Sequence, residues 1–239
     1  MKTLLAISPH LDDAIFSAGA TLWYAAQGGW RVVVATVFTG NVAQPQSFAL
    51  ACQLDKDLAP EVEYMALRRA EDVEACSAIS AEPRHLPLLE APHRGYADAA
   101  ALFGNVREDD HAGGQVGGLL AALMDELRPD RLLGPLGIGG HVDHLIVRDT
   151  LARTAGATPL SWWEDWPYLD RAGKIDRTHV FAHSLADEGR AAKVRACMAY
   201  RTQLQFQFGG PAGLAAALAV RTTEHLHDLL LPGLEAVGV

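Results

Sequence analysis

Short aliphatic runs alternate along this chain with longer segments in which apolar residues recur every three or four positions. The runs at 4–7, 31–37 and 131–134 lack a regular apolar–polar alternation, which is typical of parallel strands covered on both faces. Segment 13–27 has helical spacing and stops at Gly28-Gly29, so it predicts an amphipathic helix. Its expected inward residues are Ile15, Ala18, Leu22, Ala25 and Ala26. Together these segments predict a strand–helix–strand unit.

The same alternation continues to about residue 200. It predicts further helices and strands, the helices over 64–79, 114–127, 142–155 and 187–200 and the strands over 84–86, 158–162 and 178–183. The first of these helices is expected to bury Leu67, Ala70, Val73, Ala75 and Cys76, and the last to bury Ala191, Val194, Cys197 and Met198. This order predicts an α/β fold, a doubly wound and mainly parallel sheet with helices on both faces. We expect a single domain over residues 1–239.

Two connections, at 39–62 and 87–113, are long for simple turns between such elements. Long loops of this kind serve as lids or substrate-binding segments, or are merely mobile. We therefore treat both as candidate parts of a ligand site.

Polar clusters follow two of the expected strands, at the positions where α/β sheets bind their ligands. The first cluster is 8–13, Ser-Pro-His-Leu-Asp-Asp, and the second is 137–144, Gly-Ile-Gly-Gly-His-Val-Asp-His. Neither contains GxGxxG, GxxxxGK[ST] or GxSxG, so the usual signatures of dinucleotide binding, P-loop hydrolysis and serine esterases are absent.

A metal site explains the two clusters better. His10 and Asp13 are three residues apart at a strand-to-helix junction, and His144 can supply a third ligand from the second cluster. Two imidazoles and one carboxylate suit Zn²⁺, with Fe²⁺ as the alternative ion, and three protein ligands leave a position open for water. The sequence therefore favours a catalytic metal site over a structural one.

Three further residues have catalytic roles in this hypothesis. Asp12 can act as general base toward water at the metal. His141 can stabilise an oxyanion or protonate a leaving amine, and Asp143 can fix the tautomer of His141. Taken separately, each cluster could instead be a helix cap with polar residues favoured by the helix dipole. A two-metal phosphoesterase would need more bridging ligands than these six residues supply.

Composition excludes several other classes of protein. The chain has 239 residues, 49% of them hydrophobic, and a net charge of −9, with no dense stripe of Lys and Arg, which argues against a nucleic-acid partner. The cysteines show no CxxC spacing and are expected to be buried reduced thiols; they are Cys52, Cys76 and Cys197. We find no apolar stretch of transmembrane length and no signal-peptide core, so we expect a cytoplasmic protein. A homo-oligomer is compatible with the sequence.

The segments Pro9-His10-Leu11-Asp12-Asp13 and His141-Val142-Asp143-His144 resemble the paired signatures of the PIG-L/LmbE family of zinc-dependent N-acetylglucosaminyl deacetylases. Segments 69–72, 164–168 and 193–203 add to the resemblance, which spans residue 3 to about 205. It implies a Rossmann-like fold and hydrolysis of the acetamide of an amino sugar or glycoconjugate, releasing acetate and a free amine. By position it also implies the roles given above for the six residues, which are His10, Asp12, Asp13, His141, Asp143 and His144.

Two departures from the family pattern affect the substrate more than the chemistry. Leu11 stands where the family often has proline, and Ala14 where it often has glutamate. Neither change removes a ligand, but together they place the chain in a variant subgroup. An amidase that acts on a thiol conjugate is the nearest alternative function, and a catalytically idle sugar-nucleotide-binding domain is the non-enzymatic one.

Two other features allow weaker predictions. Arg69 is a candidate contact for a substrate phosphate or sugar hydroxyl, although an exposed helical arginine explains it equally well. Trp162, Trp163 and Trp166 could stack on a sugar ring, but large aromatic residues mostly serve burial, so we expect them to pack in the core or an interface.

Overall fold

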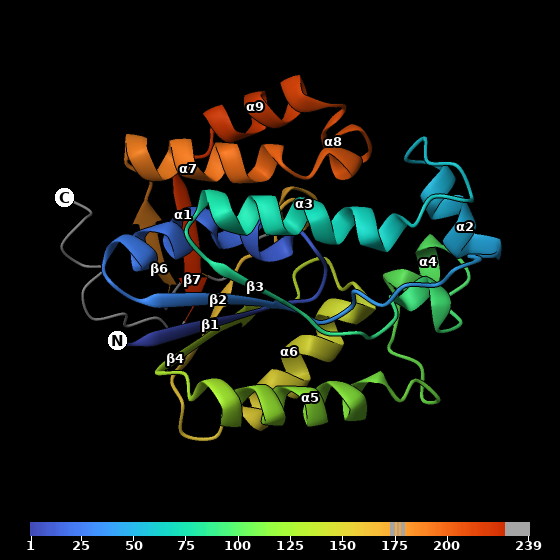
Figure 1. Cartoon of the computed structure of the whole chain (residues 1–239), viewed down its shortest axis with the longest axis horizontal. Helices are drawn as coiled ribbons and strands as arrows, with labels where there is room; N and C mark the ends of the chain where they lie inside the picture. The colour runs from blue at the N-terminus through green and yellow to red at the C-terminus, as the bar shows by residue number, and fades with distance from the viewer. Residues whose placement is uncertain (173–174, 176, 178–179, 228–239) are drawn as a thin grey trace.

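A seven-stranded sheet forms the centre of the protein (Figure 1). The computed structural model describes residues 1–172, 175, 177 and 180–227. The strand order is β3-β2-β1-β4-β5-β7-β6; the first five run parallel, and β7 lies antiparallel to both β5 and β6. Their bounds are β1 Thr3–Ser8, β2 Arg31–Thr36, β3 Glu82–His85, β4 Arg131–Pro135, β5 Leu160–Trp163, β6 Val180–Ser184 and β7 Thr223–His227. The predicted α/β fold with a mainly parallel sheet is confirmed.

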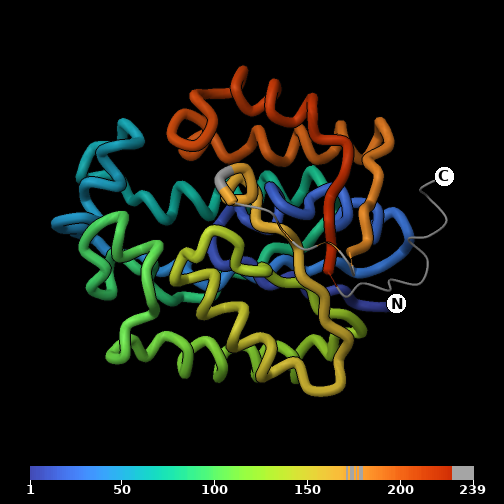
Figure 2. The backbone as a smooth tube through the Cα atoms, turned by 180° about the vertical axis from the view of Figure 1, so that it is seen from behind, coloured from blue at the N-terminus to red at the C-terminus, as the bar shows by residue number. Residues whose placement is uncertain are grey.

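Helices cover both faces of this sheet, as Figures 1 and 2 show from opposite sides. One face carries α1 Asp13–Gln27, α3 Tyr64–Ala78, α7 Asp187–Met198, α8 Arg201–Phe208 and α9 Pro211–Ala219. The other carries α5 Ala112–Leu127 and α6 Val142–Thr154. The short helices α2 Ser47–Leu54 and α4 Ala99–Leu102 lie beyond the carboxyl ends of the strands, within the two long connections, and single 3₁₀ turns span Ala91–His93 and Tyr168–Arg171 (Figure 1).

The central strands are buried on both sides, as their uninterrupted apolar sequence indicates. In β1, Leu4 and Ala6 pack toward α1 and α7, whereas Leu5 and Ile7 pack toward α5 and α6. Side chains of successive strand residues point to opposite faces, so one six-residue strand contributes to two separate cores.

The predicted inward face of α3 is only partly right: Ala75 and Cys76 are buried as predicted, but the other three residues are not. Leu67 and Val73 are 37% and 49% exposed, and Ala70 is exposed as well. The helix instead buries charged residues that have partners elsewhere in the fold: Arg68 pairs with Glu90, Glu71 with Thr202 and Asp72 with Tyr200. Hydrophobic spacing could not indicate this, because burial of these charged side chains is stabilised by hydrogen bonds to residues far away in sequence. In α7, similarly, Ala191 is exposed, while Ala192, Lys193 and Ala196 are buried beside Cys197.

Helix α1 is kinked at Ala18, whose φ of −132° is not helical. The carboxylate of Glu224, on β7, accepts hydrogen bonds from the main-chain N–H groups of Ala20 and Thr21 at 3.0 and 2.8 Å. It also pairs with Lys193 at 2.6 Å, and both side chains are buried. The kink therefore has an identifiable cause. The buried Glu224 carboxylate accepts hydrogen bonds from main-chain N–H groups just after Ala18, where the second half of the helix begins.

Replacing Glu224 with alanine should lower the free energy of unfolding by about 3–5 kcal/mol, because it leaves the Lys193 ammonium buried without its partner. Urea denaturation followed by circular dichroism measures this change. Glu82→Ala, which breaks an exposed ion pair with Arg31, should cost no more than about 1 kcal/mol. Equal losses in the two variants would contradict the role assigned to Glu224.

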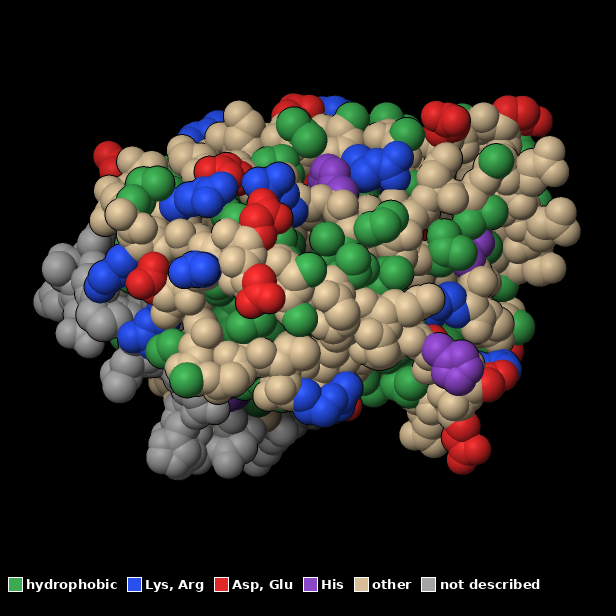
Figure 3. All heavy atoms as spheres, turned by 60° about the horizontal axis from the view of Figure 1, so that its bottom comes forward, with side chains coloured by type: hydrophobic (Ala, Val, Ile, Leu, Met, Phe, Trp, Pro, Cys, Tyr) green, Lys and Arg blue, Asp and Glu red, His purple; other side chains and the backbone are tan. Residues whose placement is uncertain are grey.

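On the face that Figure 3 shows, Lys and Arg side chains lie singly among acidic and apolar ones. Among the described residues, no helix combines the length and apolar character needed to cross a membrane.

All three cysteines are free thiols; Cys76 and Cys197 are buried as expected, whereas Cys52 is half-buried. Trp163 and Trp166 are in the core and Trp162 packs against it, so the packing prediction is confirmed.

Candidate active site

The two polar clusters meet at the carboxyl ends of neighbouring strands. β1 lies between β2 and β4, and the chain leaves it toward β2 on one side, while β4 pairs with it on the other. This is a topological switch point, where the loops on either side separate and leave a crevice. The segment after β1 carries His10, Asp12 and Asp13, and the segment after β4 carries His141 and His144.

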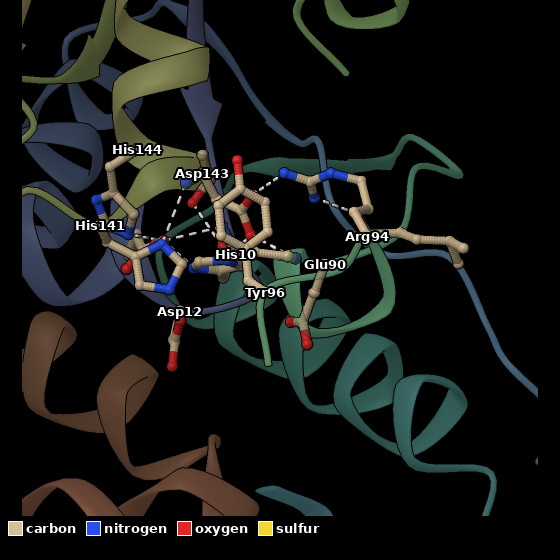
Figure 4. Close-up of polar contacts among 12 residues, drawn as sticks. His10, Asp12, Glu90, Arg94, Tyr96, His141, Asp143 and His144 are labelled. Carbon is tan, nitrogen blue, oxygen red and sulfur yellow. Dashed lines mark hydrogen bonds and ion pairs between the residues drawn. The ribbon is translucent and has the colours of Figure 1, made fainter. Parts of the chain in front are cut away.

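His10, Asp13 and His144 converge as predicted. Asp13 Oδ2 lies 3.2 Å from Nδ1 of His10 and 3.2 Å from Nε2 of His144. The three candidate ligand atoms lie within 4.8 Å of one another, and all three residues are buried. In Figure 4 His10 and His144 lie together at one end of the network. The arrangement can hold one divalent ion and leave part of its coordination sphere for water and substrate.

The His144 imidazole is oriented by Asp165, a residue for which the sequence suggested no contact. Nδ1–H of His144 donates to Asp165 Oδ1 at 2.7 Å, and Asp165 Oδ2 accepts the N–H groups of Gly137 and Ile138. Nε2 is fully buried and has no hydrogen-bond partner in the described part of the chain, although Asp13 Oδ2 lies 3.2 Å away. With a metal ion in place of a proton on Nε2, His144 would offer a lone pair beside Asp13 while Asp165 fixes its ring, which is what a metal ligand provides.

His10 has a matching support. Its Nε2–H donates to Asp143 Oδ2 at 2.9 Å, and the other carboxylate oxygen of Asp143 accepts from Arg94 at 2.6 Å. Ala91 N–H donates to the same carboxylate at 3.1 Å. Figure 4 shows Asp143 between His10 and Arg94, with Tyr96 beside it. Each candidate histidine ligand is thus backed by a buried carboxylate, an arrangement common around metals.

The expected partnership between the Asp143 carboxylate and His141 is corrected by this geometry. The main-chain N–H of Asp143 donates to Nδ1 of His141 at 3.2 Å, because His141 is the N-cap of α6, and the carboxylate is held by hydrogen bonds to His10, Arg94 and Ala91. The proton of a neutral His141 is consequently on Nε2. Burial, together with the charge on His10, lowers the pKa of His141 to about 3, so the ring is a neutral hydrogen-bond donor.

The electrostatics of the ligand group favour a cation. Burial opposes charge at His144, but Asp13 and Asp165 outweigh it and raise the pKa of His144 to about 9. Burial is likewise outweighed at His10, where hydrogen bonds with Asp13 and Asp143 raise the pKa well above its usual value. Burial also disfavours ionised Asp13, yet the two histidines hold the pKa of Asp13 well below its usual range. The carboxylates therefore stabilise positive charge here, which protons or a divalent metal can supply.

Asp12 lies apart from the ligand group and lines the adjacent cavity. Its Oδ1 is 3.5 Å from Arg68, and Gln207 donates to its Oδ2 at 3.2 Å. Burial raises the pKa of Asp12 to about 6, with Arg68 acting in the opposite direction. Figure 4 shows Asp12 and Glu90 turned to the same side, away from Asp143. A buried carboxylate with a pKa near neutrality is suited to accept and return a proton.

Arg68, rather than the predicted Arg69, reaches this cavity. Arg68 is 5% exposed and bridges Asp12 and Glu90, while Arg69 donates to the carbonyl of Thr39 at 2.6 Å. Adjacent helical residues point about 100° apart, so only one of the two arginines can face the site. Choosing between the two arginines requires knowing which side of α3 faces the core, and the apolar spacing of this helix predicted that side only in part.

The cavity itself has a volume of about 310 Å³ and extends from the candidate ligand group to α2 and α4. Both long connections contribute to its wall, as expected for substrate-binding segments; Phe48 and Lys56 come from the first and Leu102 and Phe103 from the second. His93, which the sequence left unassigned, also lines it. Its volume lies at the lower end of the range for small-molecule sites.

Comparison with known sequences adds to this geometry. The PIG-L family model, described as GlcNAc-PI de-N-acetylase, matches residues 5–155. A 2′-N-acetylparomamine deacetylase of Streptomyces fradiae is 35% identical over 178 residues, which are 73% of this chain and 60% of that protein. The chain thus matches about three fifths of the length of this relative.

Solved structures agree in fold over nearly the whole chain. A zinc-inhibited form of a teicoplanin deacetylase is 28% identical, with a TM-score of 0.79, and the match covers 95% of this chain and 97% of that one. A deacetylase of the A40926 pseudoaglycone is also 28% identical, with a TM-score of 0.74 and coverage of 93% and 94%.

Proposed function

Because this chain belongs to the PIG-L family, we propose that it is a metal-dependent hydrolase that removes the N-acetyl group from an amino sugar or its conjugate. The observation that carries the proposal is the orphaned Nε2 of buried His144, which points at Asp13 with His10 alongside. The relatives support the reaction, since three of them are described as deacetylases.

We propose His10, Asp13 and His144 as the metal ligands, offering two nitrogens and one oxygen. Zn²⁺ is the ion that this borderline set suits best, with Fe²⁺ as the alternative. The second possible group, His10, His141 and Asp143, is a poorer candidate. In that group the Asp143 carboxylate already receives three hydrogen bonds and Nδ1 of His141 accepts an N–H.

When bound, a divalent ion supplies Lewis acidity, which acidifies water and polarises an amide carbonyl. Asp12 takes a proton from the attacking water as its oxygen bonds to the carbonyl carbon. Nε2–H of neutral His141 donates a hydrogen bond to the carbonyl oxygen as negative charge develops there. The carbon–nitrogen bond then breaks, Asp12 returns the proton to the leaving nitrogen, and the products are acetate and a free amine.

Arg68 and Gln207 position the general base in this mechanism. Arg68 lies 3.5 Å from one oxygen of Asp12, and the Gln207 amide donates to the other at 3.2 Å. Both side chains line the cavity, so they can also meet sugar hydroxyls. The Arg68–Glu90 pair fixes the arginine at 2.6 Å, which restricts where Asp12 can lie.

Elemental analysis of the metal-replete protein, together with acetate release from a panel of N-acetylated amino sugars and thiol conjugates, tests the proposal. We expect about one zinc or iron per chain and release of acetate from an amino sugar. Metal with hydrolysis of thiol conjugates alone would replace the amino-sugar substrate by the alternative amide. A protein that holds no metal after metal-replete purification would overturn the mechanism.

Asp165→Asn should weaken metal binding by about 10- to 100-fold, because the amide cannot accept the His144 N–H as strongly and at the same time hold the Gly137 and Ile138 N–H groups. Competition with a chromogenic chelator measures the dissociation constant without any assay of activity. Asp170→Asn, on the exposed 3₁₀ turn that follows, is the matched control and should leave the constant unchanged. Equal constants for wild type and Asp165→Asn would remove Asp165 from the metal site.

A further inference from the structure

The cavity is lined by several large apolar side chains as well as by the polar groups of the candidate site. Its walls include Phe48 of α2, Leu102 of α4, Phe103 and Phe206 of α8. Phe103 and Phe206 are 44% and 60% exposed, which is unusual for side chains of this size. An acetyl group presents a single methyl and a sugar can stack one apolar face on a single ring, so the two together leave part of this apolar wall without a partner.

The apolar wall begins beside the reacting groups. The ring of Phe103 lies edge-on to that of His141, with 5.3 Å between centroids, and 5.9 Å from the ring of Tyr168. On α8, Phe206 precedes Gln207, whose amide donates to Asp12. A substrate held by His141 and Asp12 would therefore bring its remaining substituent between these two rings.

The two cationic side chains of the cavity wall, Arg68 and Lys56, already have partners within the protein. Arg68 pairs with Glu90 at 2.6 Å and approaches Asp12 at 3.5 Å. The Lys56 ammonium donates to the carbonyl of Cys52 at 2.7 Å and lies 4.6 Å from the centre of the Phe206 ring. Asp55 is the exposed carboxylate among the lining residues of the described chain. A substrate with several ammonium groups would find little compensating charge here.

We propose, resting on the deacetylase function above, that this part of the cavity is a subsite for an uncharged aryl or alkyl aglycone of the N-acetylated amino sugar. Phe48, Phe103 and Phe206 are its specificity-determining residues. Their rings contact the aglycone while the sugar lies against Asp12, Arg68 and His141. Free N-acetylated sugars and N-acetylated polyamino sugars are consequently poor substrates.

Kinetics with matched glycosides test the subsite. Phenyl and octyl 2-acetamido-2-deoxyglucosides should have kcat/KM values about tenfold or more above that of the methyl glycoside, mainly through a lower KM. An N-acetylated aminoglycoside should not exceed the methyl glycoside. Equal values for the phenyl, octyl and methyl glycosides, or a preference for the aminoglycoside, would overturn the proposal. The proposal would also be overturned if an N-octanoyl group on the methyl glycoside raised kcat/KM while the phenyl and octyl glycosides showed no gain. That result would place the apolar wall on the acyl side of the substrate.

Two variants locate the effect. Phe206→Ala and Phe48→Ala should each reduce the phenyl-to-methyl ratio of kcat/KM by about threefold or more, because each removes part of the apolar wall. Leu54→Ala is the matched control, since Leu54 is on α2, is 48% exposed and is not part of the cavity wall. Ratios that stay at the wild-type value in both phenylalanine variants would overturn the assignment.

Binding separates a failure of the subsite from a failure of the deacetylase function. If the metal-replete protein releases no acetate from any glycoside, the proposed function fails. Calorimetric titration with the phenyl and methyl glycosides then still decides the subsite. Tighter binding of the phenyl glycoside, lost in Phe206→Ala, supports it, and equal affinities overturn it.

Discussion

Replacing His144 with alanine should abolish stable metal binding and acetate release together. The imidazole is fully buried, and its Nε2 is one of the three candidate ligand atoms, beside those of His10 and Asp13. Losing a ligand should weaken binding by more than the roughly 10- to 100-fold expected for loss of an outer partner such as Asp165. The measurement is metal per chain after dialysis, with the rate of acetate release on the same sample.

Folding must be checked separately, because alanine also removes the hydrogen bond between His144 and Asp165. Thermal unfolding in the presence of a chelator compares wild type and variant without metal. His144→Gln is a second variant that fills more of the space and retains a polar group. A folded His144→Ala or His144→Gln protein that still holds about one metal per chain would contradict the ligand assignment.

Asp12→Asn should lower kcat by about 10²- to 10⁴-fold while metal content stays at the wild-type level. The amide has nearly the shape of the carboxylate and can still contact Arg68, but it cannot take a proton from water. Asp12 has no contact with the metal-ligand candidates comparable to that of Asp13, whose Oδ2 lies 3.2 Å from both histidines. Steady-state rates and elemental analysis on one preparation measure both quantities.

The two variants differ in whether the protein keeps its metal. His144→Ala loses metal and activity, whereas Asp12→Asn loses activity alone, so together they separate holding the ion from moving the proton. Asp55→Asn is the matched control for a carboxylate in the cavity wall, because Asp55 is exposed at the rim. An Asp12→Asn enzyme with wild-type kcat would show that another group acts as base.

Local sequence patterns were sufficient for the order of most elements up to about residue 200 and for the convergence of the candidate ligands. Uninterrupted aliphatic runs are typical of parallel strands that are covered on both faces. A glycine pair ends α1 where expected, after Gln27. Because the carboxyl ends of neighbouring parallel strands lie at one edge of a sheet, polar residues after β1 and β4 have to meet once the strands pair. The convergence of His10, Asp13 and His144 could therefore be predicted from spacing.

Partners far apart in sequence could not be identified in this way. The support of His144 by Asp165, the link from Arg94 through Asp143 to His10, and the choice of Arg68 over Arg69 depend on which segments the folded chain places side by side. The resemblance at 164–168 pointed to the segment that contains Asp165, but not to its contact. Hydrophobic periodicity indicates which face of a helix or strand is buried, and it contains no information about hydrogen bonds between elements.

The apolar wall of the cavity could not be predicted from the sequence for the same reason. The sequence marked the connections at 39–62 and 87–113 as candidate substrate segments through their length alone, and it did not predict α2 or α4 within them. The last part of the chain, with α8, α9 and β7, was also left unassigned, although His225-Leu226-His227 alternates as a strand does. Chemistry that resides in short motifs beside regular elements can be read from sequence, because strand pairing alone brings those motifs together. The shape and lining of the cavity are decided by tertiary packing, because Phe103 and Phe206 are 103 residues apart and become neighbours of one site only in the folded chain.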